Sequence, residues 1–158
     1  PEPFRLAEAV EDVAALVSAR VAEKNLELIV RIDPRLPAYV VGSTFTRGAC
    51  SNGGALSSIG VSWEVYNSTF TDNRAVGHGA NPARAGTRGG GSGGAVYTDG
   101  NRFRLLLAGT TMTDNHAHEG GGAIFFVSND RTGDLRIRSS VLKKNPSDGF
   151  ENSPGIFL

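Results

Sequence analysis

The sequence predicts a mainly β protein, a right-handed parallel β-helix of about four coils that follows an N-terminal amphipathic α-helix. A short polar phrase with a central apolar residue occurs four times, and Gly-Gly-Ala follows three of the copies at Gly53, Gly93 and Gly121. All 21 glycines lie from Gly42 onward. An internal repeat of this kind indicates a solenoid, because each unit buries its apolar face only against its neighbours. The central residues of the four copies are Phe45, Phe70, Met112 and Leu142.

Length and composition limit the classes of function. The 158 residues suffice for one domain or for a small domain with an appendage. A formal net charge of zero gives no bulk attraction to nucleic acid, so no nucleic-acid partner is expected. The single Cys50 permits no internal disulfide. The sequence contains no run of about 18 apolar residues, so we expect no membrane span in this segment. We expect the chain to be a fragment, because it starts at Pro1, and to be truncated at its C-terminus, with coil ends open to self-association.

The glycine-free residues 1–41 read as a separate piece, a helix followed by a strand. Apolar residues spaced by three and four predict an amphipathic helix from about Arg5 to Lys24. Alternating apolar residues from Leu26 to Ile32 predict a strand. One interpretation is a cap on the open end of the solenoid, in which Val13 or Val17 contacts Leu36 or Val40, and the other is a loosely attached helix. The helical stripe comprises Leu6, Val10, Val13, Val17 and Val21.

Residues 42–158 form the repeats, and apolar residues preceding each centre at intervals of two predict strands with one face inward. The step of five from Val65 to Phe70 is odd, so a bend must separate two strands. A turn-prone pair such as Asn67-Ser68 provides it. With a second corner after the centre and a third strand after Gly-Gly-Ala, we expect a three-sided coil. Stacking then makes buried neighbours of Val65, Leu107 and Ile137, which follow Val40 in the alignment.

Two columns of polar side chains follow from the same alignment. Two positions after the centres lie Arg47, Asp72, Asp114 and Lys144, which we expect to form an outward charge ladder of small energetic value. The alternative is that Asp72 and Asp114 bind a calcium ion as a cofactor, although two carboxylates supply few of the six to eight oxygens that calcium prefers. One position further, Asn73, Asn115 and Asn145 are expected to stack as a structural amide ladder.

The second coil carries an insertion of about 14 residues within 74–92. It is rich in glycine and contains basic residues but no acidic one. Insertions in repeat proteins project from one face and often bind partners, so the alternatives are a flexible loop and a contact loop for an anionic or glycan partner. The candidate interaction residues are Arg74, His78, Arg84 and Arg88.

A further polar segment, His116-Ala117-His118-Glu119, contains residue types that bind zinc. The segment falls at a glycine-bounded corner, and the sequence offers no third ligand nearby. We therefore interpret it as a solvated turn and predict no metal there.

The alternation of Phe-x-x-Asn at Phe70–Asn73 with Gly-Gly-Ala-apolar at Gly93–Val96 resembles the repeats of polymorphic outer membrane proteins and related adhesin-like β-helices. The resemblance implies a surface-exposed or secreted repeat module with an adhesion or interaction role, a glycan or protein surface partner, and no catalytic residues. Residues 3–42 separately resemble the segment of sensor histidine kinases that leads into their ATP-binding domain, although no nucleotide-binding box follows.

Three functional hypotheses follow. The first is a non-enzymatic surface module. The second is a truncated sensor histidine kinase fused to repeats, without activity of its own. The third is a polysaccharide-degrading β-helix, whose activity would depend on Asp72.

Overall fold

A computed structural model describes residues 15, 38–150 and 153–158. The chain divides into two units, Pro1–Leu36 and Pro37–Leu158, and the second contains nearly all described residues. Apart from Ala15, the predicted helix Arg5–Lys24 lies outside the described residues, as do the strand Leu26–Ile32 and the cap contacts of Val13 and Val17.

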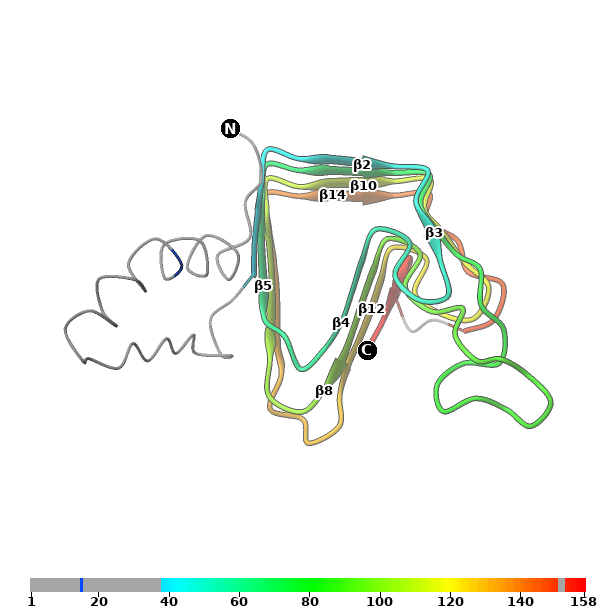
Figure 1. The fold of residues 1–158 in the computed structure, drawn as a ribbon. Coiled ribbons are helices and arrows are strands. Elements are labelled where there is room, and N and C mark those ends of the chain that lie inside the picture. The colour runs from blue at the N-terminus through cyan, green and yellow to red at the C-terminus, as the bar shows by residue number, and fades with distance from the viewer. Residues whose placement is uncertain (1–14, 16–37, 151–152) are drawn as a thin grey trace, which may run out of the picture. The chain divides into compact units, whose positions relative to one another are not determined.

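The second unit is a stack of parallel strands, as the sequence predicts (Figure 1). Four sheets have the strand orders β1-β5-β9-β13, β2-β6-β10-β14, β3-β7-β11 and β4-β8-β12-β15. The strands are β1 (Ala38–Val41), β2 (Thr44–Thr46), β3 (Ala49–Cys50), β4 (Leu56–Ile59), β5 (Trp63–Tyr66), β6 (Thr69–Thr71), β7 (Arg74–Ala75), β8 (Val96–Gly100), β9 (Arg104–Ala108), β10 (Thr111–Thr113), β11 (His116–Ala117), β12 (Ile124–Ser128), β13 (Asp134–Arg138), β14 (Val141–Lys143) and β15 (Ile156–Phe157).

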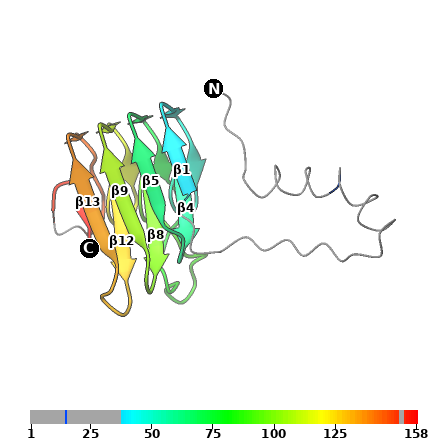
Figure 2. The same ribbon diagram turned by 90° about the vertical axis from the view of Figure 1, so that its left-hand side faces the viewer.

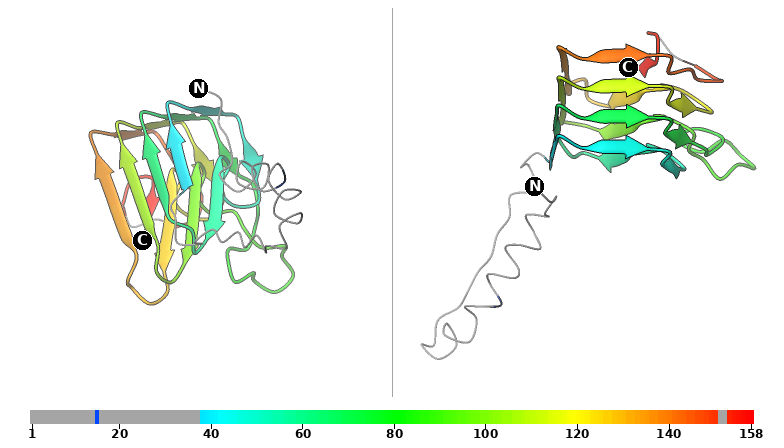
Figure 3. Two further views of the ribbon diagram at one scale, coloured as in Figure 1. Left: turned by 60° about the vertical axis from the view of Figure 1, so that its left-hand side comes forward. Right: turned by 90° about the horizontal axis from the view of Figure 1, so that it is seen from above.

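The parallel β-helix is right-handed. The chain turns clockwise in the view of Figure 1, from β5 through β6 toward β8, and the later coils lie farther from that viewer, as Figure 3 shows from above. Figure 2 shows one wall face-on, with β1, β5, β9 and β13 side by side. Right-handed crossovers are the rule for parallel strands, because a right-twisted strand returns to its sheet only in that sense.

The predicted register is confirmed by the strand pairing. Val65 lies opposite Val40 on one side and Leu107 on the other, and Ile137 lies opposite Leu107. Val65 and Leu107 are fully buried, but Ile137 is 37% exposed, so the expectation that it is buried is wrong. Ile137 belongs to β13, the edge strand of its sheet, and therefore has a neighbouring strand on one side alone.

The repeat centres also stack. Phe70 pairs with Phe45 and with Met112, which in turn pairs with Leu142. The rings of Phe45 and Phe70 are stacked with centroids 4.8 Å apart. Phe70 and Met112 are fully buried and form the centre of the core together with residues from the other walls. The other large, fully buried core side chains are Val65, Leu105, Leu107, Ile124 and Val96.

Each coil has more corners than the sequence predicts. The first bend has left-handed backbone at Asn67 and Gly109, as expected for a turn at these positions. At the second corner the left-handed residues are Asp72 and Asp114, so the chain turns one residue before Asn73 and Asn115. The two residues after each asparagine then pair as the short sheet β3-β7-β11, and the coil is not three-sided but has a short fourth wall.

The Gly-Gly-Ala phrase has a steric cause. Gly93 has a φ of +70°, which a side chain disfavours. A Cβ on Gly94 would lie 2.7 Å from the backbone nitrogen of His116 in the next coil. The third residue, Ala95, is fully buried and directly precedes β8.

Within the described part of the chain, no helix has the length and apolar character needed to cross a membrane.

Candidate functional site

The inserted segment between β7 and β8 folds back on the coil stack. His78 and Ala80 form antiparallel bridges with Gly89 and Gly90, respectively, so the segment is a narrow loop that projects beside the short sheet (Figure 1). A Cβ on Gly77 would lie 2.6 Å from the backbone nitrogen of Gly91, which explains why small residues line both arms. The glycines at 89–91 are buried, whereas residues 81–88 are exposed.

A buried carboxylate fixes this loop to the next coil. Glu119 is 7% exposed and accepts hydrogen bonds from the backbone N–H of Gly79 at 2.7 Å and from the guanidinium of Arg84 at 2.6 Å. Both bonds are charge-assisted, and a buried carboxylate needs such partners. Glu119 is therefore a loop anchor, a role that the sequence did not indicate because Gly79 and Arg84 lie about 40 residues upstream.

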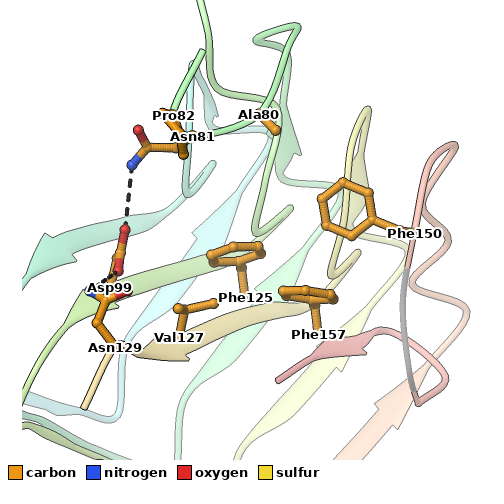
Figure 4. Close-up of a pocket in the computed structure, with 9 residues that line it drawn as sticks. All are labelled: Ala80, Asn81, Pro82, Asp99, Phe125, Val127, Asn129, Phe150 and Phe157. Atoms are coloured by element: carbon orange, nitrogen blue, oxygen red, sulfur yellow. Dashed lines mark hydrogen bonds between the residues drawn. The ribbon is translucent and has the colours of Figure 1, made fainter. Parts of the chain in front are cut away.

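A pocket of about 340 Å³ lies between this loop and the outer face of the sheet β4-β8-β12-β15 (Figure 4). Its apolar floor consists of Phe125, Val127 and Phe157, and Phe150 forms a wall. The remaining lining residues come from the loop and from the ends of β8 and β12: Ala80, Asn81, Pro82, Asp99 and Asn129.

The aromatic floor is a stack that continues across coils. The ring of Phe125 lies between those of Tyr97 and Phe157, with centroid separations of 5.0 Å and 4.9 Å. Phe150 meets Phe157 edge-on at 4.9 Å. Because neighbouring rings cover one another's faces, the pocket presents mainly ring edges together with the Val127 side chain.

Asp99 organises the polar rim. One carboxylate oxygen, Oδ2, accepts from the Tyr97 hydroxyl at 3.0 Å and from the Asn81 amide at 3.4 Å. The other, Oδ1, accepts from the Asn129 amide at 3.2 Å and from the backbone N–H of Gly100 at 2.7 Å. Burial raises the pKa of Tyr97 to about 12, so this phenol keeps its proton at neutral pH and donates to Asp99.

The three asparagines of the repeats form a continuous ladder inside the stack. The Nδ2 of Asn73 donates to Oδ1 of Asn115 at 2.9 Å, and Nδ2 of Asn115 donates to Oδ1 of Asn145 at 2.8 Å. The three amides also donate to the backbone carbonyls of Phe45, Phe70 and Met112, respectively. All three side chains are buried, so the ladder holds the second corner from within.

Residues 67–99 and 109–127 match the family model of the Chlamydia polymorphic membrane protein repeat. These parts of the chain are similar to that repeat. The matched residues contain the bend, the central residue, the ladder asparagine and the Gly-Gly-Ala phrase of the second and third coils. They do not include residues 3–42, whose resemblance to sensor histidine kinases gains no support. No curated protein and no solved structure matches the chain.

The residues that match the polymorphic membrane protein repeat supply part of the pocket but not all of it. Six lining residues lie within the matched stretches: Ala80, Asn81, Pro82, Asp99, Phe125 and Val127. Asn129, Phe150 and Phe157 lie beyond them. The matched stretches thus supply the loop side and part of the apolar floor, and later segments complete the enclosure.

The four predicted interaction residues do not converge on one point. Arg74 pairs with Asp72 at 2.9 Å, and Arg84 pairs with Glu119, so both arginines have carboxylate partners. His78 stacks on His118 with a centroid separation of 4.3 Å. Arg88 is exposed. These pairings reduce the positive charge that the sequence assigns to the loop.

The predicted charge column is also changed by its neighbours. Asp72 and Asp114 occupy equivalent corners of adjacent coils, because Thr71 and Thr113 are in register. Asp72 is bound to Arg74 within its own coil. Neither aspartate belongs to the cluster of three metal-ligand side chains that the described residues contain.

Proposed function

We propose that the chain is a non-enzymatic repeat module of a surface-exposed or secreted β-helix protein, and that it binds a neutral glycan in the pocket beside the inserted loop. The similarity to the polymorphic membrane protein repeat supports the surface location and the repeat role. The observation that carries the binding proposal is the pocket itself, in which an apolar floor faces a rim of carboxylate and amide groups.

This combination suits a sugar. Pockets of a few hundred Å³ hold small ligands, and a sugar offers both apolar C–H groups and hydroxyls. Phe125 and Val127 would contact the C–H groups, while the amides of Asn81 and Asn129 would bond the hydroxyls. The rim carboxylate Asp99 and the pairing of Arg74 and Arg84 disfavour an anionic sugar.

The same rim argues for binding rather than cleavage. Glycoside hydrolysis generally uses two carboxylates flanking the scissile bond, about 5 to 10 Å apart. Among the residues that line this pocket, Asp99 is the one carboxylate, and it already accepts four hydrogen bonds.

A glycan array probed with the labelled 158-residue chain tests the proposal. We expect binding to one class of neutral glycans, and we expect Asn129→Ala to weaken it about tenfold by removing one rim amide. Asn101→Ala is the matched control, because Asn101 is exposed and is not a lining residue. Absence of binding to every glycan on the array, or equal binding by the Asn129→Ala variant, would overturn the glycan proposal. Release of reducing ends from a bound glycan would instead support the enzyme hypothesis.

A further inference from the structure

All three histidines of the chain gather at one corner of the third coil. His116 and His118 flank Ala117, which is fully buried, so alternation along the strand directs both imidazoles outward. The His118 ring stacks on that of His78 and meets His116 edge-on at 5.7 Å. This arrangement brings imidazoles from the second and third coils together.

The fourth coil adds a carboxylate. Ser147 forms a parallel bridge with Ala117, and the backbone N–H of Asp148 donates to the Ala117 carbonyl at 3.0 Å. This register places the Asp148 carboxylate 2.9 Å from Nε2 of His116. One ligand atom from each of His116, His118 and Asp148 lies within 4.8 Å of the others. The third ligand that the sequence lacks near His116 is therefore supplied from 32 residues downstream.

We propose that His116, His118 and Asp148 form a zinc site that links the third and fourth coils. Two imidazole nitrogens and one carboxylate oxygen are ligands that zinc prefers, whereas calcium needs six to eight oxygens. The Asp148 side chain is 60% exposed and already lies beside His116, so a small movement brings its oxygen to coordination distance. Water completes a four-coordinate site.

The surroundings orient the His118 ring for this role. Its Nδ1 lies 3.3 Å from the Gly77 carbonyl, an acceptor that favours the tautomer with a proton on Nδ1. In that tautomer the lone pair on Nε2 is free for a metal. A backbone carbonyl on the far nitrogen is the usual partner of a metal-binding histidine. Gly77 belongs to the inserted segment, so zinc would also connect the base of the loop to both coils.

Isothermal titration of the untagged 158-residue chain with zinc chloride tests the site. We expect one zinc per chain and little response to calcium. Asp148→Asn should weaken zinc binding at least tenfold, because it removes the carboxylate charge while keeping the shape. The matched control is Asp130→Asn, an exposed aspartate in the turn after β12, which should bind zinc as the original chain does. Equal affinity of the Asp148→Asn variant, or a response to calcium equal to that for zinc, would overturn the three-ligand zinc site.

Histidine ring signals in NMR spectra supply a second readout. With three histidines in the chain, each ring signal can be assigned by one substitution. Stoichiometric zinc should shift the signals of His116 and His118 together. A shift confined to one ring would contradict the proposal. If a histidine substitution used for assignment perturbs folding, Asp148→Asn still tests the site, because Asp148 lies on the surface.

Discussion

The side-chain amide of Asn73 donates to Oδ1 of Asn115 at 2.9 Å, across 42 residues of sequence. The same Oδ1 accepts the backbone N–H of Asn73 at 3.0 Å. One buried oxygen thus satisfies two donors of the preceding coil, and Asn145 repeats the arrangement for Asn115. Because the ladder is buried, its amides take the place that water would occupy at an exposed corner.

Asn115→Ala should therefore be strongly destabilising. It leaves the backbone N–H of Asn73 without an acceptor and reduces the Asn73 amide to its bond with the Phe45 carbonyl, and a buried unsatisfied group costs about 1–3 kcal/mol. We expect the free energy of unfolding in urea to fall by about 3 kcal/mol. Asn101→Ala, at an exposed position, should change it by less than about 0.5 kcal/mol. Equal stability of the two variants would show that the ladder contributes little.

A second prediction compares two paired residues in the same apolar column. Leu107 is fully buried between neighbouring coils, whereas its partner Ile137 lies on the edge strand and is 37% exposed. Leu107→Ala should lower the free energy of unfolding by about 2–5 kcal/mol, as expected for a core cavity. Ile137→Ala should cost less, because a smaller part of this side chain is buried from water. Similar losses in chemical denaturation would argue against this difference in burial.

The repeat alignment predicted this column because equivalent residues of a solenoid stack on one another. Val65, Leu107 and Phe70 occupy the predicted places for that reason. The alignment could not predict the short sheet β3-β7-β11, since two-residue strands such as Ala49–Cys50 carry no periodic signal. The alignment also did not predict that Ile137 is exposed, because a repeat pattern does not indicate which strand lies at the edge of a sheet.

The two candidate sites were harder to predict from the sequence, because both combine residues of the repeats with residues of irregular segments. The pocket needs Asn81 from the insertion and Phe150 from the segment after β14. The histidine cluster needs Asp148, whose register with Ala117 is set by coil stacking. Asp72 and Glu119, the acidic partners of Arg74 and Arg84, lie outside the inserted segment 74–92. The composition of this segment alone therefore overstates the positive charge of the loop.

Glu119→Gln should release the inserted loop without unfolding the coils. The substitution preserves shape but removes the charge that strengthens the bonds from Gly79 and Arg84. We expect limited trypsin digestion after Arg84 or Arg88 to accelerate severalfold, while the urea midpoint changes little. Glu64→Gln is the control, because Glu64 bonds Tyr66 on a different wall. Unchanged cleavage in Glu119→Gln would mean that the glycine contacts alone hold the loop.

The last prediction concerns alkaline pH and Tyr97. Burial raises the pKa of this phenol from 10.0 to about 12 in the folded protein. Since the folded-state pKa is the higher one, its contribution to stability is complete below about pH 10 and is lost as the pH rises toward 12. The unfolded chain then ionises first and is favoured. Tyr97→Phe should therefore lose less stability than the original chain between pH 10 and 12, measured by urea unfolding at each pH.

Tyr39→Phe provides the comparison for this experiment, because Tyr39 is 64% exposed and makes no buried contact of the Tyr97 type. This variant should keep the alkaline loss of the original chain. Absorbance titration of the folded protein near 295 nm should show the ionisation of Tyr97 close to pH 12, and the absorbance change there should be smaller in Tyr97→Phe. An absorbance change near pH 12 as large in Tyr97→Phe as in the original chain would show that the pKa of Tyr97 is not raised to that value.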